Sequence, residues 1–274
     1  MNAAYVIASQ EIANGFRNRW VLGACLLMIL FSLALATLGS APVGVVGARP
    51  FAVLVVSLAS LSTLLVPMLA LLLAHDAIVG EAERGTLALT LAYPVSRRAF
   101  LLGKFMGHLA ILALAIIAGL GTAAALLVWR GAVLDGDAAA LAQLALSALL
   151  LGAAFLALGY VASSLVRERT TAAAIAIGLW LVLVLVYDLA FLALLVDAGE
   201  AIPRTLVAAA IAANPVDAFR LINLGMNEAT ALISGMEAAG RAIGLSPATL
   251  YGALLAWLFA ALGLGWALFR RREL

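Results

Sequence analysis

The sequence predicts an all-α membrane protein with six transmembrane helices. Of its 274 residues, 66% are apolar and only 11% are charged, and the mean hydropathy is +1.17. A water-soluble domain carries about 25% charged residues. A soluble core of this size could not hide so much apolar surface from water, so the surrounding solvent must be lipid.

Six apolar runs are each long enough to cross the hydrocarbon, which takes about 20 helical residues. The second run contains Pro67, where we expect a kink. The predicted spans are Trp20–Leu38, Phe51–Val79, Phe100–Trp129, Ala138–Leu165, Thr171–Val196 and Ala248–Phe269.

The positions of the cations predict how the spans are oriented. With both termini in the cytoplasm, the inner segments hold Arg17, Arg19, Arg84, Arg97, Arg98, Lys104, Arg167, Arg169, Arg270, Arg271 and Arg272. The outer segments then hold only Arg49, Arg130, Arg204, Arg220 and Arg241. This bias predicts a multi-pass protein of a bacterial inner (plasma) membrane with both termini cytoplasmic. Because the cations are dispersed and the net charge is only +2, a nucleic-acid partner is not expected.

Residues 1–19 predict an amphipathic helix on the inner membrane surface. At helical spacing, Tyr5, Ala8, Ile12, Phe16 and Trp20 share one face, while Gln10, Glu11, Asn14, Arg17 and Asn18 share the other. A signal peptide is the competing interpretation, because Ala34-Leu35-Ala36 resembles a cleavage site. The first 19 residues are, however, too long and too regularly patterned for the charged n-region that begins an ordinary signal peptide.

The polar stretch between the second and third runs predicts a short cytoplasmic helix. Gly85 is a plausible helix stop, Thr86 can cap a helix over Leu87–Ala92, and Tyr93-Pro94 ends it. Ser96 can cap the next helix. The alternative is an ordinary solvated loop, but the short helix carries Leu87, Leu89 and Leu91 with no large enough partner in the chain to cover them. This favours a docking element.

The residues of this stretch, "EAERGTLALTLAYPVSRRAFLLGK", resemble the signature of ABC-2-type permeases, which are membrane subunits of ATP-binding-cassette transporters. In that family the segment forms a coupling helix that fits a groove on the ATPase subunit, and the amphipathic N-terminus is its elbow helix. The resemblance implies a coupling segment over residues 80–98. Its implied ATPase-coupling residues are Gly80, Glu81, Glu83, Arg84, Gly85, Thr86, Leu87, Arg97 and Arg98.

Five further segments are similar to the permeases of the nitrous-oxide reductase maturation system: "ALLLAHDAIVGE", "LLGKFMGH", "LVLVYDLAFLALLV", "NPVDAFRLINL" and "FRRR". The similarity implies a homodimer with cytoplasmic ATPase subunits and a periplasmic partner. It also implies a role in maturing the copper–sulfur centre of that enzyme. ATP and Mg²⁺ would be bound by the ATPase subunits.

The chain itself is expected to be non-catalytic. It has no G-x-x-x-x-G-K-[ST], H-E-x-x-H or G-x-S-x-G motif. Soft ligands suited to Cu(I) are sparse and scattered, namely one Cys (Cys25) and six Met, and the two His are distant from each other. No metal site is therefore predicted, and a sulfur species or ATP-driven work on the periplasmic partner fits as well as copper transport.

Asp188 is the one acid well inside a predicted span, and it follows Tyr187. Because an intramembrane carboxylate is costly, both residues are candidates for a translocation site. The alternative is a structural pair with a neighbouring helix or with Tyr187.

The periplasmic connection over residues 197–247 is too long for a simple loop. A helix at the outer face is predicted, with Asn214 as its cap, Pro215 in its first turn and Asp217 favouring its N-terminal dipole. The candidate residues at the periplasmic face are Asn214, Asp217, Arg220, Asn223 and Met226.

Three other functions remain open at this point. The first is an ABC-2 exporter of another substrate, such as a lipid or peptide. The second is a secondary transporter with a proton relay at Asp188. The third is an intramembrane enzyme, which the missing motifs disfavour.

Overall fold

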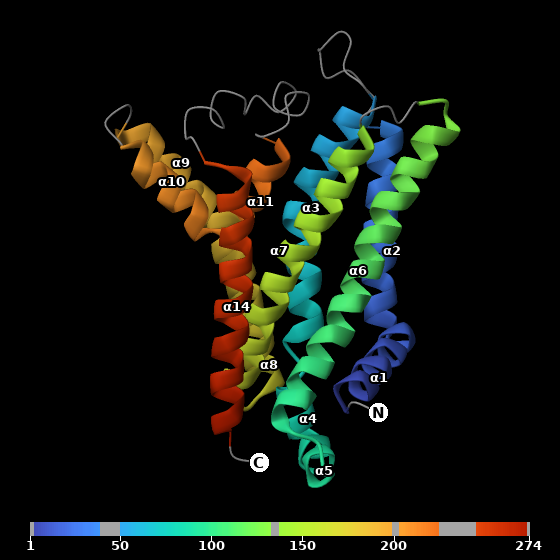
Figure 1. The fold of residues 1–274 in the computed structure, drawn as a ribbon, viewed down its shortest axis with the longest axis vertical. Coiled ribbons are helices and arrows are strands. Elements are labelled where there is room, and N and C mark those ends of the chain that lie inside the picture. Colours follow the sequence, from blue (N-terminus) through green and yellow to red (C-terminus); the bar gives the residue numbers. More distant parts are fainter. Residues whose placement is uncertain (1–2, 39–49, 133–136, 199–202, 225–244, 273–274) are drawn as a thin grey trace.

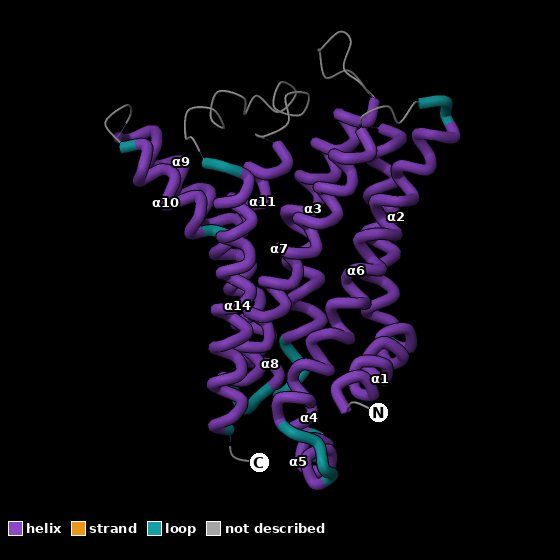
Figure 2. The backbone as a smooth tube through the Cα atoms, viewed as in Figure 1, coloured by secondary structure: helices purple, strands orange, loops and turns teal. Residues whose placement is uncertain are grey.

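The computed structural model describes residues 3–38, 50–132, 137–198, 203–224 and 245–272, and these residues contain helices and no strand. Six helices are long and apolar enough to cross a membrane, and they form one bundle (Figures 1 and 2). The spans are α2 Arg19–Leu38, α3 Pro50–Ala74, α6 Arg97–Trp129, α7 Asp137–Leu165, the composite helix that begins with α8 Arg169–Trp180, and α14 Pro247–Arg271. The predicted fold class is confirmed.

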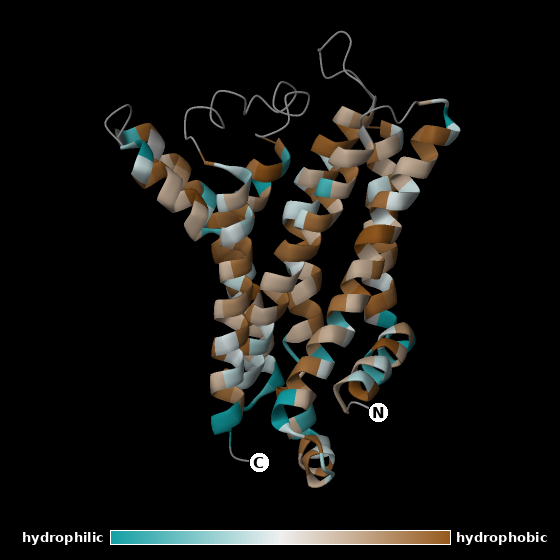
Figure 3. Ribbon diagram, in the orientation of Figure 1, coloured by the Kyte–Doolittle hydropathy of each residue, from teal (hydrophilic) through white to brown (hydrophobic). Residues whose placement is uncertain are grey.

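Helix α7 lies at the centre of the bundle and packs against α3 and α14. Small residues allow this close approach: a Cβ at Gly159 would lie 2.5 Å from Ala74 Cβ on α3. Without a hydrophobic driving force between helices in lipid, such close packing supplies much of the association energy. Figure 3 shows apolar residues along the middle of the spans and hydrophilic residues gathered at the end that carries α4.

Helix α1 (Ala3–Arg17) lies against α6 at the end of the bundle that also holds the C-terminus (Figure 1). Gly103 and Gly107 of α6 leave room for it, because Cβ atoms there would lie 2.7 Å from Ala4 O and 2.6 Å from Glu11 Cβ. Tyr5 and Phe16 remain 66% and 58% exposed, and the position of α1 at the membrane surface stays a prediction.

The second predicted span, Phe51–Val79, lies within a candidate span over Phe51–Glu83 whose helix is interrupted after Ala74. Helix α3 stops at Ala74, a turn follows, and the short helix α4 (Val79–Glu83) begins a separate element. Gly85 adopts the left-handed conformation (φ 72°) directly after α4, which confirms the predicted helix stop.

Helix α5 runs from Thr86 to Ala92, so it begins one residue earlier than predicted, and Tyr93 follows its last residue, as predicted. The prediction that Thr86 caps this helix is wrong. Gly85 occupies the cap position, and the Thr86 hydroxyl donates to Glu81 O at 3.2 Å instead. Ser96 does cap α6, because its Oγ accepts the Ala99 N–H at 3.1 Å.

The fifth span is a composite of three segments. Helix α8 passes into a π-helix, η1 (Leu181–Val186), which continues as α9 (Tyr187–Ala198). Helix α10 (Arg204–Ala213) follows, and a bend of 108° separates it from α11 (Pro215–Leu224). The sequence predicted one helix in this connection, whereas the structure contains both α10 and α11.

Candidate functional site

A buried ammonium joins three elements at the end of the bundle that carries both termini. Lys104 of α6 is 4% exposed, and its Nζ lies 2.6 Å from Glu11 Oε1 of α1 and 2.5 Å from Glu81 Oε1 of α4. A buried charge is tolerated only when it is paired. This ion-pair cluster therefore fixes α1 and α4 against the same turn of α6.

The cluster continues inward through His108 and Tyr160. Glu11 Oε2 lies 3.3 Å from His108 Nε2, and the Tyr160 hydroxyl on α7 is 2.9 Å from His108 Nδ1. Burial raises the pKa of Glu11, but the hydrogen bond with His108 and the charge of Lys104 outweigh it and lower this pKa to about 2. Glu11 is therefore ionised at neutral pH and holds α1 onto the bundle electrostatically.

A second ion pair joins the turn after α3 to the start of the fifth span. Arg169 binds Asp76 with two nitrogens, Nε at 2.7 Å from Oδ1 and Nη2 at 2.9 Å from Oδ2. The Arg169 backbone N–H also donates to Glu83 Oε1 at 2.8 Å. The beginning of α8 is thus attached to both ends of the segment that contains α4.

Helix α7 contacts the same region through a hydroxyl group, and the end of α14 is bound by an arginine from the start of α6. Ser163 Oγ of α7 accepts the backbone N–H groups of Ile78 and Val79, each at 3.0 Å. Arg97 at the start of α6 donates through Nη1 to the carbonyls of Phe269, Arg270 and Arg272, at 2.9–3.0 Å. Such donors satisfy carbonyls that the end of a helix leaves without partners.

The residues that the sequence assigns to ATPase coupling divide into two groups. Gly80, Glu81, Leu87 and Arg97 point into the chain: Gly80 and Leu87 are buried, Glu81 pairs with Lys104, and Arg97 binds the end of α14. The expectation that nothing in the chain covers Leu87 is wrong, because Leu87 is 2% exposed and belongs to the chain's own core. The residues at the surface are Glu83, Arg84, Gly85, Thr86 and Arg98, together with Leu89 at 67% and Tyr93 at 72% exposure.

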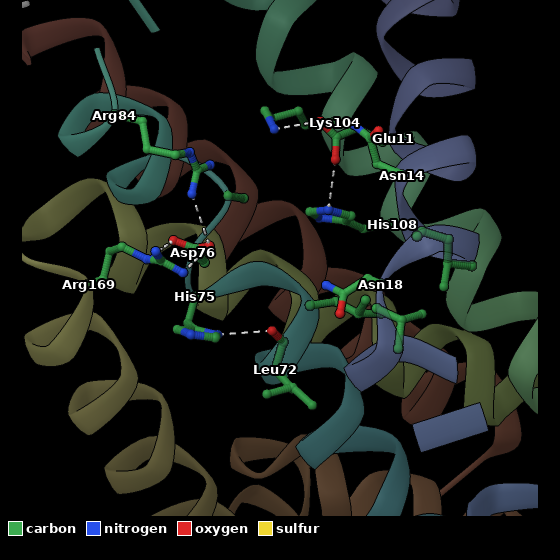
Figure 4. Close-up of a pocket in the computed structure, with 15 residues that line it drawn as sticks. Glu11, Asn14, Asn18, Leu72, His75, Asp76, Arg84, Lys104, His108 and Arg169 are labelled. Carbon is green, nitrogen blue, oxygen red and sulfur yellow. Dashed lines mark hydrogen bonds and ion pairs between the residues drawn. The ribbon is translucent and has the colours of Figure 1, made fainter. Parts of the chain in front are cut away.

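A polar pocket of about 440 Å³ lies between α1, the turn after α3, α6 and the start of α8. Figure 4 shows Glu11, Lys104 and His108 on one side of it and Asp76, Arg84 and Arg169 on the other. His75 also lines it, and its Nδ1 donates to Leu72 O at 2.9 Å. From the sequence, Glu11, Lys104 and Arg169 are recognisable only as polar or cationic residues. Lys104 pairs with Glu11, and Arg169 with Asp76, each across 93 residues, and such distant pairing leaves no local pattern.

The candidates Asp188 and Tyr187 meet the outer-face candidates in a second cluster. Asp188 Oδ2 lies 2.7 Å from Arg220 Nη1 of α11, and the same nitrogen lies 3.5 Å from Asp217 Oδ1. Tyr187 donates to Ala210 O of α10 at 2.7 Å. Asp188 is thus paired with a neighbouring helix, which is the arrangement expected for a structural role, while a role in translocation stays a prediction.

The π-helix positions the break between α10 and α11. Asn214 caps α11 as predicted, because its Oδ1 accepts the Val216 N–H at 2.9 Å. Its Nδ2 donates to the carbonyl of Leu183 in η1 at 2.8 Å. Asn223 binds Ser147 of α7 at 2.9 Å. Met226 lies outside the described residues. Among those residues, no group of three or more His, Cys, Asp or Glu side chains is arranged to hold a metal ion.

The described residues thus form a six-span bundle with a helical segment held by ion pairs at the end that carries both termini. Residues 5–274 match the family described as "ABC-2 family transporter protein", and the chain belongs to this family. It is a membrane permease subunit of an ABC transporter.

Two relatives are similar over their full length. The chain is 44% identical over 275 residues to the "Probable ABC transporter permease protein NosY" of Stutzerimonas stutzeri, covering 99% of each protein. It is 45% identical over 280 residues to the protein of the same name from Pseudomonas aeruginosa, covering 100% of each.

Proposed function

We propose that this chain is the permease of a system that matures the copper–sulfur centre of nitrous-oxide reductase. It acts as a homodimer in the bacterial inner membrane, with both termini cytoplasmic, two ATPase subunits that bind ATP and Mg²⁺, and a periplasmic partner. The full-length similarity to two permeases named NosY supports this proposal. The complex moves a copper or sulfur species, or it transmits ATP-driven motion to the periplasmic partner.

The observation that carries the mechanism is the position of Lys104 between Glu11 and Glu81. We assign residues 80–98 to ATPase coupling and residues 1–19 to the elbow helix. A displacement of α4 then pulls directly on α6 and α1, because breaking a buried ion pair costs about 3–5 kcal/mol. The Asp76–Arg169 pair passes the same displacement to the fifth span.

The docking surface for the ATPase consists of the exposed residues of this segment. Glu83, Gly85, Thr86 and Arg98 present backbone and charge, and Leu89 presents an apolar side chain that is 67% exposed. Arg84 lies at the edge of this surface, and its side chain lines the polar pocket beside Asp76. Beneath this surface lie four residues that attach it to the spans, namely Gly80, Glu81, Leu87 and Arg97. This division follows from their burial and pairing.

The outer cluster transmits the motion to the periplasmic side, where residues 197–247 form the connection that faces the partner. Tyr187 and Asp188 tie the outer part of the fifth span to α10 and α11. Asn214 and Asn223 attach α11 to η1 and α7, and Asp217 and Arg220 complete the cluster. A rotation of the fifth span would therefore move α11 with it.

The docking surface is tested by Leu89→Glu, with Leu38→Glu as a control at the opposite end, where the side chain is 72% exposed. Leu89→Glu should abolish co-purification of the ATPase subunits, while Leu38→Glu retains them. Undiminished co-purification and ATPase rate in Leu89→Glu would contradict docking at α5.

Family membership is equally compatible with an exporter permease for another substrate, such as a lipid or peptide. Deleting the gene separates the two functions. Under our proposal the strain makes nitrous-oxide reductase that lacks the spectrum of its copper–sulfur centre. A normal spectrum in the deletion strain would support the exporter instead.

A further inference from the structure

The polar pocket beside α1 adjoins an apolar groove. Leu72 and His75 line both this pocket and an apolar groove of about 280 Å³ between α3 and α8. Met68, Ala173, Ala176, Ile177 and Trp180 complete most of that groove. A charged pocket beside an apolar groove is complementary to an amphiphile.

The depth of the pocket matches that of lipid headgroups. It is lined by α1, whose exposed Tyr5 and Phe16 place this helix at the membrane interface. It is also lined by Asp76, just after α3 ends, and by Arg169, where α8 begins. The groove runs from this level along α3 and α8 into the hydrocarbon.

Among the described residues, Arg84 is the cation of the pocket whose hydrogen-bond donors are not taken up by a carboxylate. Lys104 is used by two carboxylates, and Arg169 binds Asp76 through two nitrogens. The closest acid to Arg84 is Asp76, at 3.8 Å, which is too far for a hydrogen bond. The Arg84 guanidinium is half exposed, and its planar set of donors suits a phosphate group.

We propose that this pocket binds a membrane phospholipid, with the phosphodiester at Arg84 and one acyl chain in the groove between α3 and α8. The lipid comes from the leaflet on the side of both termini. The lipid would occupy the space between α1, α3 and α8. It would contact both α1 and the fifth span, and would so link two elements through its own atoms. The proposal does not depend on the identity of the cargo.

The proposal is tested by counting lipids retained by the full-length chain, purified in mild detergent with its co-purifying subunits, using native mass spectrometry. Arg84→Gln should lower the lipid count by about one per chain, while Arg270→Gln, which changes an exposed arginine of α14 at the same end but outside the pocket, retains it. Ala173→Leu should fill the groove and also remove the lipid. Ala174→Leu, exposed on α8 and outside the groove, is the matched control.

Added phospholipid vesicles should raise the unfolding temperature of the delipidated wild type and leave that of Arg84→Gln unchanged. If inorganic phosphate alone gives the same rise, the site binds small anions and the lipid proposal is wrong. If Ala173→Leu splits the complex without changing the lipid count, a second copy of the chain covers the groove, and the proposal also fails.

Discussion

Lys104 shows how one side chain can set the position of several elements. Its ammonium is the only link that the described residues show between Glu11 of α1 and Glu81 of α4. Because the side chain is 5% exposed, water cannot take the place of the ammonium between the two carboxylates if the lysine is lost. The energetics of this residue can be tested directly.

Lys104→Met should lower the free energy of unfolding by about 3–5 kcal/mol, because two carboxylates are left facing each other without a cation. The measurement is unfolding by SDS titration in mixed micelles. The triple variant that adds Glu11→Gln and Glu81→Gln should recover much of the loss. Wild-type stability in Lys104→Met alone would show that the cluster does not hold the elements together.

The Glu11 carboxylate should make stability depend on pH. Its pKa is lowered from 4.5 to about 2 in the folded chain, so the unfolded chain binds more protons between these values. The contribution is fully present above about pH 4.5 and is lost as the pH falls towards about 2. Thermal unfolding followed from about pH 6 to about pH 3 should therefore show a smaller decline in Glu11→Gln than in the wild type.

At the scale of elements, the π-helix η1 sets the rotation of everything beyond it in the fifth span. The backbone hydrogen bonds of a π-helix join residues five apart in the chain, whereas those of an α-helix join residues four apart. Such segments commonly occur at functional sites. Tyr187 and Asp188 follow η1 directly, and both bind α10 or α11.

Deleting Val182, which is 52% exposed, should restore α-helical geometry and keep Asp188 directed at Arg220, because the shorter α-helical segment rotates the chain by nearly the same angle as the wider π-helix. Deleting Ile177 from α8, which is 61% exposed, should instead turn Asp188 by about 100° away from Arg220. In the wild type and in the first deletion, Asp188→Asn and Arg220→Gln should be non-additive by about 0.5–3 kcal/mol, whereas in the second deletion the two effects should add. A coupling that is lost in the first deletion, or that survives the second, would mean that the rotation across η1 does not position Asp188.

The elements themselves were largely predictable from sequence, because a span needs only an unbroken apolar run. The helix stop at Gly85 and the cap at Ser96 were equally local signals and are confirmed. The π-helix was not predictable, since Leu181–Val186 has the same composition as an ordinary span. The inward position of Leu87 and the pairing of Lys104 depend on residues far away in the chain, which periodicity does not report.

At the scale of the whole molecule, polar contacts gather at two ends of an otherwise apolar bundle. At one end the segment containing α4 contacts α1, α6, α7 and α8. At the other, α11 contacts η1, α7 and the start of α9. The spans between them are the only described connection, so a signal between the two ends must pass through helix packing.

The proposed orientation of the whole chain can be tested with single cysteines in a Cys25→Ser background. Arg270→Cys at the end of α14 and Arg130→Cys after α6 are both exposed and lie at opposite ends of the bundle (Figure 1). A membrane-impermeant maleimide should label Arg130→Cys in spheroplasts and Arg270→Cys only in inverted vesicles. The opposite labelling pattern would place both termini in the periplasm.

The separation of 93 residues between Glu11 and Lys104 also has a consequence for biogenesis. The ribosome makes α1 well before α6, so Glu11 has no ammonium to bind while the first two spans enter the bilayer. Until then its carboxylate must stay hydrated, and α1 must wait in the headgroup layer. Insertion of the third span would therefore be the step at which α1 reaches its final position. An assembly intermediate that is arrested before this span should leave the N-terminus accessible to protease.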